Sequence, residues 1–407
     1  MFCGFAAGAW LGGAEAPIKL VNPEISPITV SLVMVCGVFL ARWSVPALIR
    51  GTSHIRTDVG QAPHLVVWAI LAGCMWAVAN TLTIYAIRNV GLSIAFPLWN
   101  TNSLLGIFWG FLLFKELHAA GWKRWLGVIG GAVCMFAGAT LLAIASSHEA
   151  APGKATLGIA AALGAGILWG TMYIPYRKAY LTGMNPLSFI TFFTVGELGT
   201  MLILAVGYRG LAPLWSELNG ARPVLFWLML GGFVWVIGDL FQQYATKYVG
   251  ISRGIPLSNT NQLWGLLWGV LVFHELRGAG HATYMQVAGG SILMALGAVA
   301  IALSSADSRE HSSWRDAAQR EGDRYGVERD YVHAGMEGRA YEAESQRRTA
   351  LDWVLILGAT ALFMGLAVMA KPPQVEVTLG WAAALTVAMF TLMAACGIAL
   401  WRTTGFR

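Results

Sequence analysis

Two acids that lie inside long apolar runs are the residues most able to do chemistry. Glu197 is near the centre of one run, and Asp239 lies well inside the next. A charged side chain is costly in a membrane, so an acid kept at this depth is a functional candidate by default. These two acids could take up and release a proton, or coordinate another coupling cation. The alternative is a structural acid that pairs with a base between helices, for instance Lys247 or Arg253 nearby in the sequence.

Two polar triplets place amide donors and acceptors inside two other apolar runs. They are Asn100, Thr101 and Asn102, and Asn259, Thr260 and Asn261. Pro97 and Pro256 precede them and loosen the helix, so we expect backbone carbonyls that face a cavity. The alternative is that these amides only hold helices together. Gln262 follows the second triplet where Ser103 follows the first, and this difference could suit a chiral ligand.

Four tryptophans lie close to these polar residues in the sequence. Trp109 and Trp268 each follow the last residue of a triplet by seven positions, which is two turns along the same helix face. Trp76 lies four residues before Asn80, and Trp235 has the same place in another run. The four rings could stack on the apolar face of a solute, and Asn80 could bind it. The alternative is core packing or an interfacial belt, where tryptophan is common.

The composition indicates a membrane protein. Of the 407 residues, 57% are hydrophobic and only 12% are charged, and the mean hydropathy is +0.60. An ordinary soluble domain has about a quarter charged residues. The net charge of +6 could suit nucleic acid, but the basic residues mostly lie between apolar runs, as in loops on the inner side of a membrane. The sequence has no HExxH, GxGxxG or Walker motif, which argues against an enzyme, a cofactor site and an ATP-driven pump.

The apolar runs predict the spans and their orientation. A helix that crosses a bilayer needs about 20 apolar residues, and the chain divides into about twelve such stretches. They are 1–17, 27–49, 64–87, 91–114, 121–145, 156–176, 186–208, 223–247, 251–273, 282–303, 351–370 and 379–401. The segment 306–350 is rich in arginine and acids, so we expect a solvated cytoplasmic linker there. Basic residues are more frequent in the loops on the same side as this linker, which predicts a multi-pass protein of the plasma (inner) membrane with both termini in the cytoplasm.

The first half of the chain returns in the second half. The segment GLSIAFPLWNTNSLLGIFWGFLLFKEL begins at Gly91 and matches GISRGIPLSNTNQLWGLLWGVLVFHEL, which begins at Gly250, a shift of 159 residues without a gap. We therefore predict two five-helix units, residues 1–147 and 150–305, followed by the linker and an additional two-helix hairpin at 351–407. An odd number of spans inserts the second unit upside down, which is the inverted-repeat plan of secondary transporters with the substrate near the midplane.

Four charged residues at span ends belong to the same pattern. Lys19 and Arg177 each follow a proline at the end of the first span of a unit. Glu116 and Glu275 end the repeated block. We interpret the two bases mainly as anchors at the membrane surface and the two acids as interfacial caps or surface pairs. A gate ion pair is the alternative.

The chain resembles a known transporter superfamily. The paired five-span units, the two Trp-x-x-x-Asn/Asp segments and the Asn-Thr-Asn block that ends in Phe-x-Glu-Leu are together similar to the drug/metabolite transporter superfamily. Within it, the chain is most similar to the glucose/ribose porter and L-rhamnose–proton symporter families of sugar uptake proteins. The resemblance covers roughly residues 1–305, and the C-terminal hairpin departs from it.

The resemblance implies an all-α, ten-helix carrier of a small solute, a sugar first of all. Such a carrier works by alternating access, is driven by a proton or sodium gradient, and has no organic cofactor. Two other functions stay open: an exporter of small metabolites or drugs, and a membrane sensor or scaffold that recruits a partner through the charged linker. The additional hairpin leaves a homodimer open as well.

Overall fold

The computed structural model describes residues 1–14, 16–20, 25–90, 95, 98–118, 120–145, 155–304, 306, 308–338, 348–371 and 375–406. The regular secondary structure of these residues is helical, and none of them lies in a strand. The chain is therefore an all-α protein, as the sequence predicts. Pro97, Glu15 and the boundary between the two predicted units lie outside the described residues.

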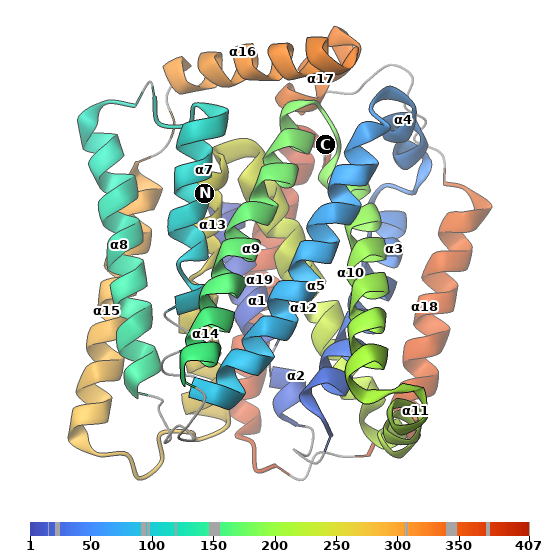
Figure 1. Ribbon diagram of the computed structural model, residues 1–407, viewed down its shortest axis with the longest axis vertical. Helices are drawn as coiled ribbons and strands as arrows, with labels where there is room; N and C mark the ends of the chain where they lie inside the picture. Colours follow the sequence, from blue (N-terminus) through green and yellow to red (C-terminus); the bar gives the residue numbers. More distant parts are fainter. Residues whose placement is uncertain are drawn as a thin grey trace.

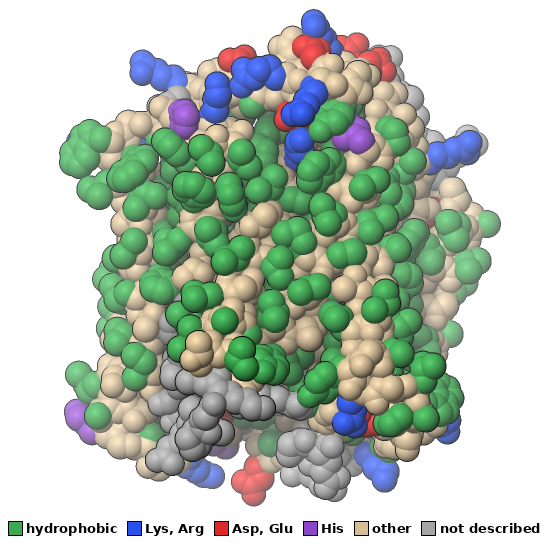
Figure 2. Space-filling model, viewed as in Figure 1, with side chains coloured by type: hydrophobic (Ala, Val, Ile, Leu, Met, Phe, Trp, Pro, Cys, Tyr) green, Lys and Arg blue, Asp and Glu red, His purple; other side chains and the backbone are tan. Residues whose placement is uncertain are grey.

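Among the described residues, nine helices are long and apolar enough to cross a membrane. They are α3 (Pro27–Ile49), α5 (His64–Val90), α8 (Trp122–Ala145), α9 (Ala155–Leu181), α10 (Pro186–Arg209), α12 (Leu225–Val249), α15 (His281–Leu303), α18 (Ala350–Met369) and α19 (Leu379–Thr404). Each corresponds to one predicted stretch. On the face shown in Figure 2, hydrophobic side chains cover the middle of the molecule and charged side chains gather at its two ends. The protein is an integral, multi-pass membrane protein.

The other three predicted stretches are not single helices. The first contains α1 (Phe2–Gly13) and the short α2 (Ala16–Lys19), and the fourth contains α7 (Asn102–Phe114). The ninth contains α13 (Ile251–Ser258), α14 (Asn261–Leu267) and a π-helical turn, η2 (Trp268–Val272). Both polar triplets therefore lie where a membrane segment is interrupted.

Shorter helices lie at the two ends of the bundle. Both chain termini are in the upper part of Figure 1, together with α4 (Ser53–Gln61), α16 (Ser308–Tyr325) and α17 (Arg329–Glu337). We call this the termini end. At the opposite end lie α11 (Leu211–Gly220) and the 3-10 turn η1 (Arg222–Val224). Which end faces the cytoplasm stays a prediction.

The 159-residue shift relates each pair of packed core helices to another packed pair, or relates the two helices of a pair to each other. Helix α1 packs on α12, and α9 packs on α5. Likewise, α3 packs on α12 and α10 on α5, while α3 pairs with α10 and α8 with α15. This pattern accords with two related units, of which the inverted arrangement stays a prediction.

Glycines bring these helices into close contact. A Cβ atom added to Gly73 of α5 would lie 1.9 Å from the Phe193 carbonyl oxygen of α10, and one added to Gly196 of α10 would lie 2.1 Å from the Ile70 carbonyl oxygen. Helices pack this closely in membranes only where both surfaces are small. The α5–α10 contact therefore depends on glycine.

The predicted C-terminal pair of helices is present. Helix α18 packs on α3 and α12, whereas α19 packs on α1 and η2. In Figure 1, α18 lies at the edge of the bundle and α19 lies behind its centre. Each additional helix thus extends a different part of the core.

The linker differs from the expectation of a solvated segment. Helices α16 and α17 are amphipathic, and they pack on the main core through Trp314 and Ala318 of α16, Tyr331 and Val332 of α17, and Val327 between the two helices. Trp314 and Tyr331 are each only 3% exposed. This packing was not anticipated from the sequence, because the high average charge of 306–350 concealed these apolar positions, which recur at helical spacing.

We expect Gly196→Ala to lower the unfolding temperature of the protein in detergent, because its Cβ atom would collide with the Ile70 backbone. Overpacking of this kind costs about 1–3 kcal/mol. Gly199→Ala on the same helix is the matched control, since nothing lies within 4 Å of its added Cβ atom. That control should raise the unfolding temperature or leave it unchanged. Equal effects of the two substitutions would contradict the described α5–α10 contact.

Candidate functional site

The two polar triplets lie at helix interruptions. Helix α13 ends at Ser258, a turn at Asn259 and Thr260 follows, and α14 begins at Asn261. In the first half, a turn at 100–101 precedes the start of α7 at Asn102. Irregular backbone at membrane depth is tolerated only where it is buried in protein or lines a cavity. The interruptions therefore agree with the predicted loosening of these segments.

The two triplets contact each other through the residues that differ between the repeats. Gln262 Nε2 donates a hydrogen bond to Asn100 Oδ1 at 3.0 Å. Asn259 Nδ2 donates to the Ser103 hydroxyl oxygen. The 159-residue shift relates Asn100 to Asn259 and Ser103 to Gln262, so each bond is the counterpart of the other. The structure thus brings the two triplets together in one polar cluster, which we define as residues 100–103 and 259–262.

The amides of this cluster are only partly satisfied. Among the described residues, Asn261 Oδ1 and Gln262 Oε1 are buried without a hydrogen-bond partner. The same is true of the indole Nε1 atoms of Trp109 and Trp268, which follow the cluster on α7 and at the start of η2. An unpaired buried polar atom is costly, so such atoms are expected to be satisfied by water or a ligand.

The threonines of the triplets serve local structure instead. The Thr101 hydroxyl donates to the Leu98 carbonyl at 2.7 Å, and the Thr260 hydroxyl donates to the Leu257 carbonyl at 2.8 Å. Thr260 also faces Gly8 of α1, where an added Cβ atom would lie 2.1 Å from its hydroxyl oxygen. Their assignment to substrate binding stays a prediction, and these contacts favour the alternative of helix packing.

The remaining candidate residues, Trp76, Trp235 and Asn80, make contacts of their own. Trp76 and Trp235 contact each other edge to face, with ring centroids 5.4 Å apart. Asn80 is half-buried on α5, and its backbone carbonyl accepts a hydrogen bond from Thr83 at 2.7 Å. The predicted roles of these three residues in binding are not tested by these contacts.

The two membrane acids meet at a single base, Arg42. Arg42 Nη1 lies 2.9 Å from Glu197 Oε2, and Arg42 Nη2 lies 2.8 Å from Asp239 Oδ2. The three side chains come from α3, α10 and α12 and are almost fully buried. The guanidinium also lies over the rings of Phe193 and Trp235, 4.2 Å and 5.2 Å from their centroids.

Two further contacts distinguish the acids. Gln243 Nε2, one turn after Asp239, donates to Asp239 Oδ1 at 3.0 Å, so both oxygens of that carboxylate are bonded. Glu197 Oε1 accepts no hydrogen bond of good geometry from any described residue. The carboxylate of Glu197 is therefore less fully hydrogen-bonded than that of Asp239.

Sequence reasoning identified both acids but not their base. The predicted alternative partners were wrong: Lys247 lies over the ring of Tyr248, and Arg253 pairs with Glu310. The signal for Arg42 was available, since it is a lone charge in the middle of the run 27–49. A base inside a membrane span is as costly as an acid there, so it too is a functional candidate.

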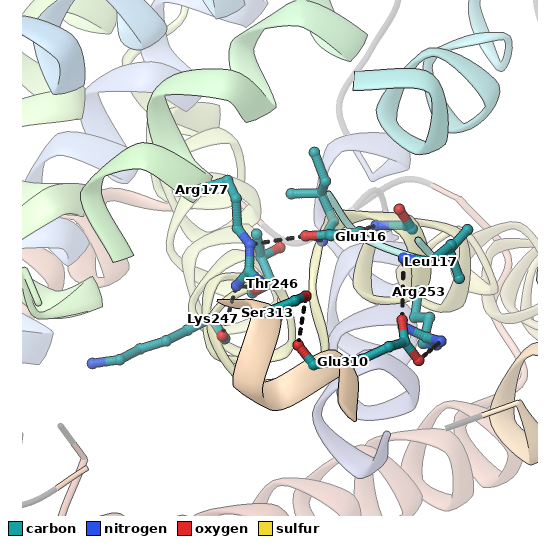
Figure 3. Close-up of polar contacts among 10 residues, drawn as sticks. Glu116, Leu117, Arg177, Thr246, Lys247, Arg253, Glu310 and Ser313 are labelled. Carbon is teal, nitrogen blue, oxygen red and sulfur yellow. Dashed lines mark hydrogen bonds and ion pairs between the residues drawn. The ribbon is translucent and has the colours of Figure 1, made fainter. Parts of the chain in front are cut away.

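Ion pairs lie at both ends of the bundle. At the termini end, Arg177 Nε lies 2.8 Å from Glu116 Oε1, and both side chains are fully buried (Figure 3). At the opposite end, Lys19 pairs with Glu275, and these side chains are 36% and 49% exposed. The exposed Lys19–Glu275 pair agrees with the interpretation as a surface pair, whereas the buried Arg177–Glu116 pair does not agree with a surface anchor, and a gate role stays a prediction.

Comparison with known proteins identifies the family. The family model described as sugar transport protein matches residues 23–145 and 161–322. The chain belongs to the sugar transport protein family. This agrees with the resemblance to sugar uptake proteins noted in the sequence.

Individual relatives are more distant. A glucose uptake protein of Staphylococcus xylosus is 23% identical over 236 residues, which cover 56% of this chain and 76% of that protein. Proteins of Streptococcus pyogenes that are named for sugar uptake are 45% identical over 64 residues, and the match spans only 22% of their length. A protein crystal structure that is 17% identical in sequence matches with a TM-score of 0.51. The match covers 74% of this chain and 96% of that chain, and it supports the fold alone.

We expect Arg42→Met to destabilise the protein strongly, because it leaves two buried carboxylates without their base. Breaking a buried ion pair from one side costs about 3–5 kcal/mol. The triple variant Arg42→Met/Glu197→Gln/Asp239→Asn removes all three charges and should recover most of the loss. Thermal unfolding in detergent measures both. A triple variant less stable than the single one would contradict this account.

Proposed function

We propose that the protein transports a sugar by alternating access and that the solute binds at the polar cluster of residues 100–103 and 259–262. The observation that carries this proposal is the pair of equivalent contacts between the two triplets, beside amide oxygens and indole nitrogens that lack protein partners. A polyhydroxylated solute supplies many donors and acceptors to such groups. Membership of the family and the names of the relatives support the class of solute.

The two triplets also fit a rocking mechanism. They come from different halves of the chain and meet in the membrane, where each interrupted segment can change its angle without breaking a continuous helix. A solute held between them contacts both halves at once. Movement of one half against the other would then expose the solute first at one end and later at the other.

We propose that a proton drives this transport and that Glu197 carries it. With both acids ionised, Arg42 leaves one negative charge uncompensated in the core of the bundle. A buried net charge is unfavourable, so one proton on Glu197 restores neutrality while Asp239 keeps its bonds to Arg42 and Gln243. Sodium is the alternative coupling cation.

Two consecutive glutamines of α12 lie between the proposed coupling residues and the segment that leads to the polar cluster. Asp239 contacts Gln243 on α12, and the preceding residue, Gln242, donates from Nε2 to the Ser258 hydroxyl of α13. Ser258 directly precedes Asn259. A change in charge at Asp239 and Glu197 can therefore reach the interruption between α13 and α14 through these contacts.

We expect uptake of a labelled sugar into proteoliposomes to require an inward proton gradient. The panel contains rhamnose, glucose and ribose. Glu197→Gln mimics the permanently protonated acid and should abolish gradient-driven accumulation while it leaves exchange of labelled for unlabelled sugar in place. Glu376→Gln, an acid-to-amide change at an exposed residue outside the bundle, is the matched control.

Other outcomes of this measurement point to other functions. Accumulation that follows sodium instead of protons would transfer the coupling role to that cation. A lack of sugar movement under every gradient would overturn the sugar proposal and favour export of a small metabolite. Accumulation by Glu197→Gln at the wild-type level would exclude this acid as the proton carrier.

We expect Asn261→Leu to raise the KM for the sugar about 3- to 10-fold, the range that corresponds to one lost hydrogen bond. Its stability in detergent should not fall, because the replaced Oδ1 atom has no partner among the described residues. Asn100→Leu should lower stability, because it breaks the bond from Gln262. If Asn261→Leu left KM unchanged and lowered stability, this amide would serve helix packing.

A further inference from the structure

Helix α16 is attached to the termini end by a fully buried acid. Glu310 accepts hydrogen bonds from Arg253 Nη2 at 2.8 Å and from Arg253 Nη1 at 3.2 Å. Its Oε1 atom also accepts from the Leu117 backbone N–H at 3.1 Å. One carboxylate thus connects the chain just after α7 to α13, which belong to different halves of the sequence (Figure 3).

Arg253 is in turn fixed by the helix that leads to α16. Its Nε atom donates to the Ser304 carbonyl at 2.7 Å, and Ser304 follows the last residue of α15. Arg253 and Glu310 are both fully buried. A buried charge pair of this kind is strongly unfavourable to separate, because each group would lose a countercharge that it contacts directly in a buried region.

A second contact of α16 covers the Glu116–Arg177 ion pair. The guanidinium of Arg177 lies 4.6 Å from the ring centroid of Trp314. Beneath it, Glu116 accepts hydrogen bonds from the backbone N–H groups of Ile251 at 3.1 Å and Ser252 at 2.9 Å. Trp314, Arg177, Glu116 and the start of α13 therefore form successive layers.

Arg177 joins these layers to a further helix. Its Nη1 atom donates to the carbonyls of Thr246 at 3.2 Å and Lys247 at 3.0 Å, near the end of α12 (Figure 3). Helices α9, α12 and α13 and the chain after α7 thus meet beneath α16. Any separation of these elements at the termini end breaks charged contacts that α16 shields from water.

The C-terminal half of α16 is fixed less tightly. Lys178 lies 3.5 Å from Glu321, and Tyr325 stacks on His64 with ring centroids 3.9 Å apart. These side chains are only partly buried, so water screens them more than it screens Glu310. The firm attachment of α16 is therefore at its N-terminal half.

We propose that α16 is a strap that holds the termini end of the carrier closed and that it must leave Arg253 and Arg177 before that end can open. The inference rests on alternating access as proposed above. Its particular content is that residues 308–325, at the edge of the transport core, control access at one end. The ion pair at the opposite end, Lys19–Glu275, is already reached by water.

Cysteine labelling tests the strap. In a variant without the five native cysteines, Ser252→Cys places a thiol beneath Glu116, where wild-type contacts exclude water. The reagent is a membrane-impermeant maleimide, added to vesicles whose termini end faces the medium. We expect Glu310→Gln and Trp314→Leu each to accelerate labelling about tenfold, as expected when a hydrogen bond to a buried charge or a cation–π contact is lost. Arg320→Gln, on the exposed face of α16, is the matched control and should not change the rate.

Release of the strap is measured separately, as the rate of trypsin cleavage at the arginines of α16. Faster cleavage with unchanged Ser252→Cys labelling would overturn the proposal, because the strap would leave without opening the end. Unchanged cleavage in both variants would also overturn it, because these contacts would not hold the strap. Thermal unfolding of each variant separates strap release from loss of the fold. Since labelling needs no solute, failure of sugar transport with accelerated labelling would refute the proposed solute and leave the strap intact.

Discussion

The guanidinium of Arg42 has to be neutralised wherever it is buried, and this requirement determines how three core helices meet. Glu197 and Asp239 supply the countercharges from α10 and α12, and the rings of Phe193 and Trp235 cover the guanidinium. The close glycine contacts between the core helices bring the backbones near enough for these short bonds. Because these three side chains are almost fully buried, separation of the helices would leave uncompensated charges inside the protein, so the three helices cannot move apart independently of the charges.

Helix α12 also contacts one of the two interrupted segments. Helix α12 bears Asp239 and, one turn later, the glutamines that reach α9 and α13. The polar cluster lies beyond this connection, where helical hydrogen bonding is already broken. The contacts of α12 therefore extend from the charged residues to Ser258, which directly precedes the polar cluster, and contiguous contacts of this kind are one way in which sites in a protein are coupled.

Much of the fold follows from the sequence. The apolar runs predict all nine described long helices, since length and hydropathy decide which helices suit a bilayer. The repeat predicts that Asn100 and Asn259 occupy equivalent places, and their equivalent contacts agree with this. Arg42 is visible in the sequence as a lone charge in an apolar run, but its pairing with Glu197 was not predictable, because the two residues are 155 positions apart. The docking of α16 was missed for a different reason: a segment rich in charges also contains the apolar side chains and the buried acid, Glu310, that attach it.

The ion pairs at the two ends of the bundle differ in how far the surrounding solution reaches them. Dissolved salt screens charges that water can reach, and its effect is small on charges buried in protein. Lys19 and Glu275 are therefore sensitive to ionic strength, whereas Arg177 and Glu116 are shielded from it. The balance between the two ends of the molecule thus depends on the salt concentration of one compartment more than on that of the other.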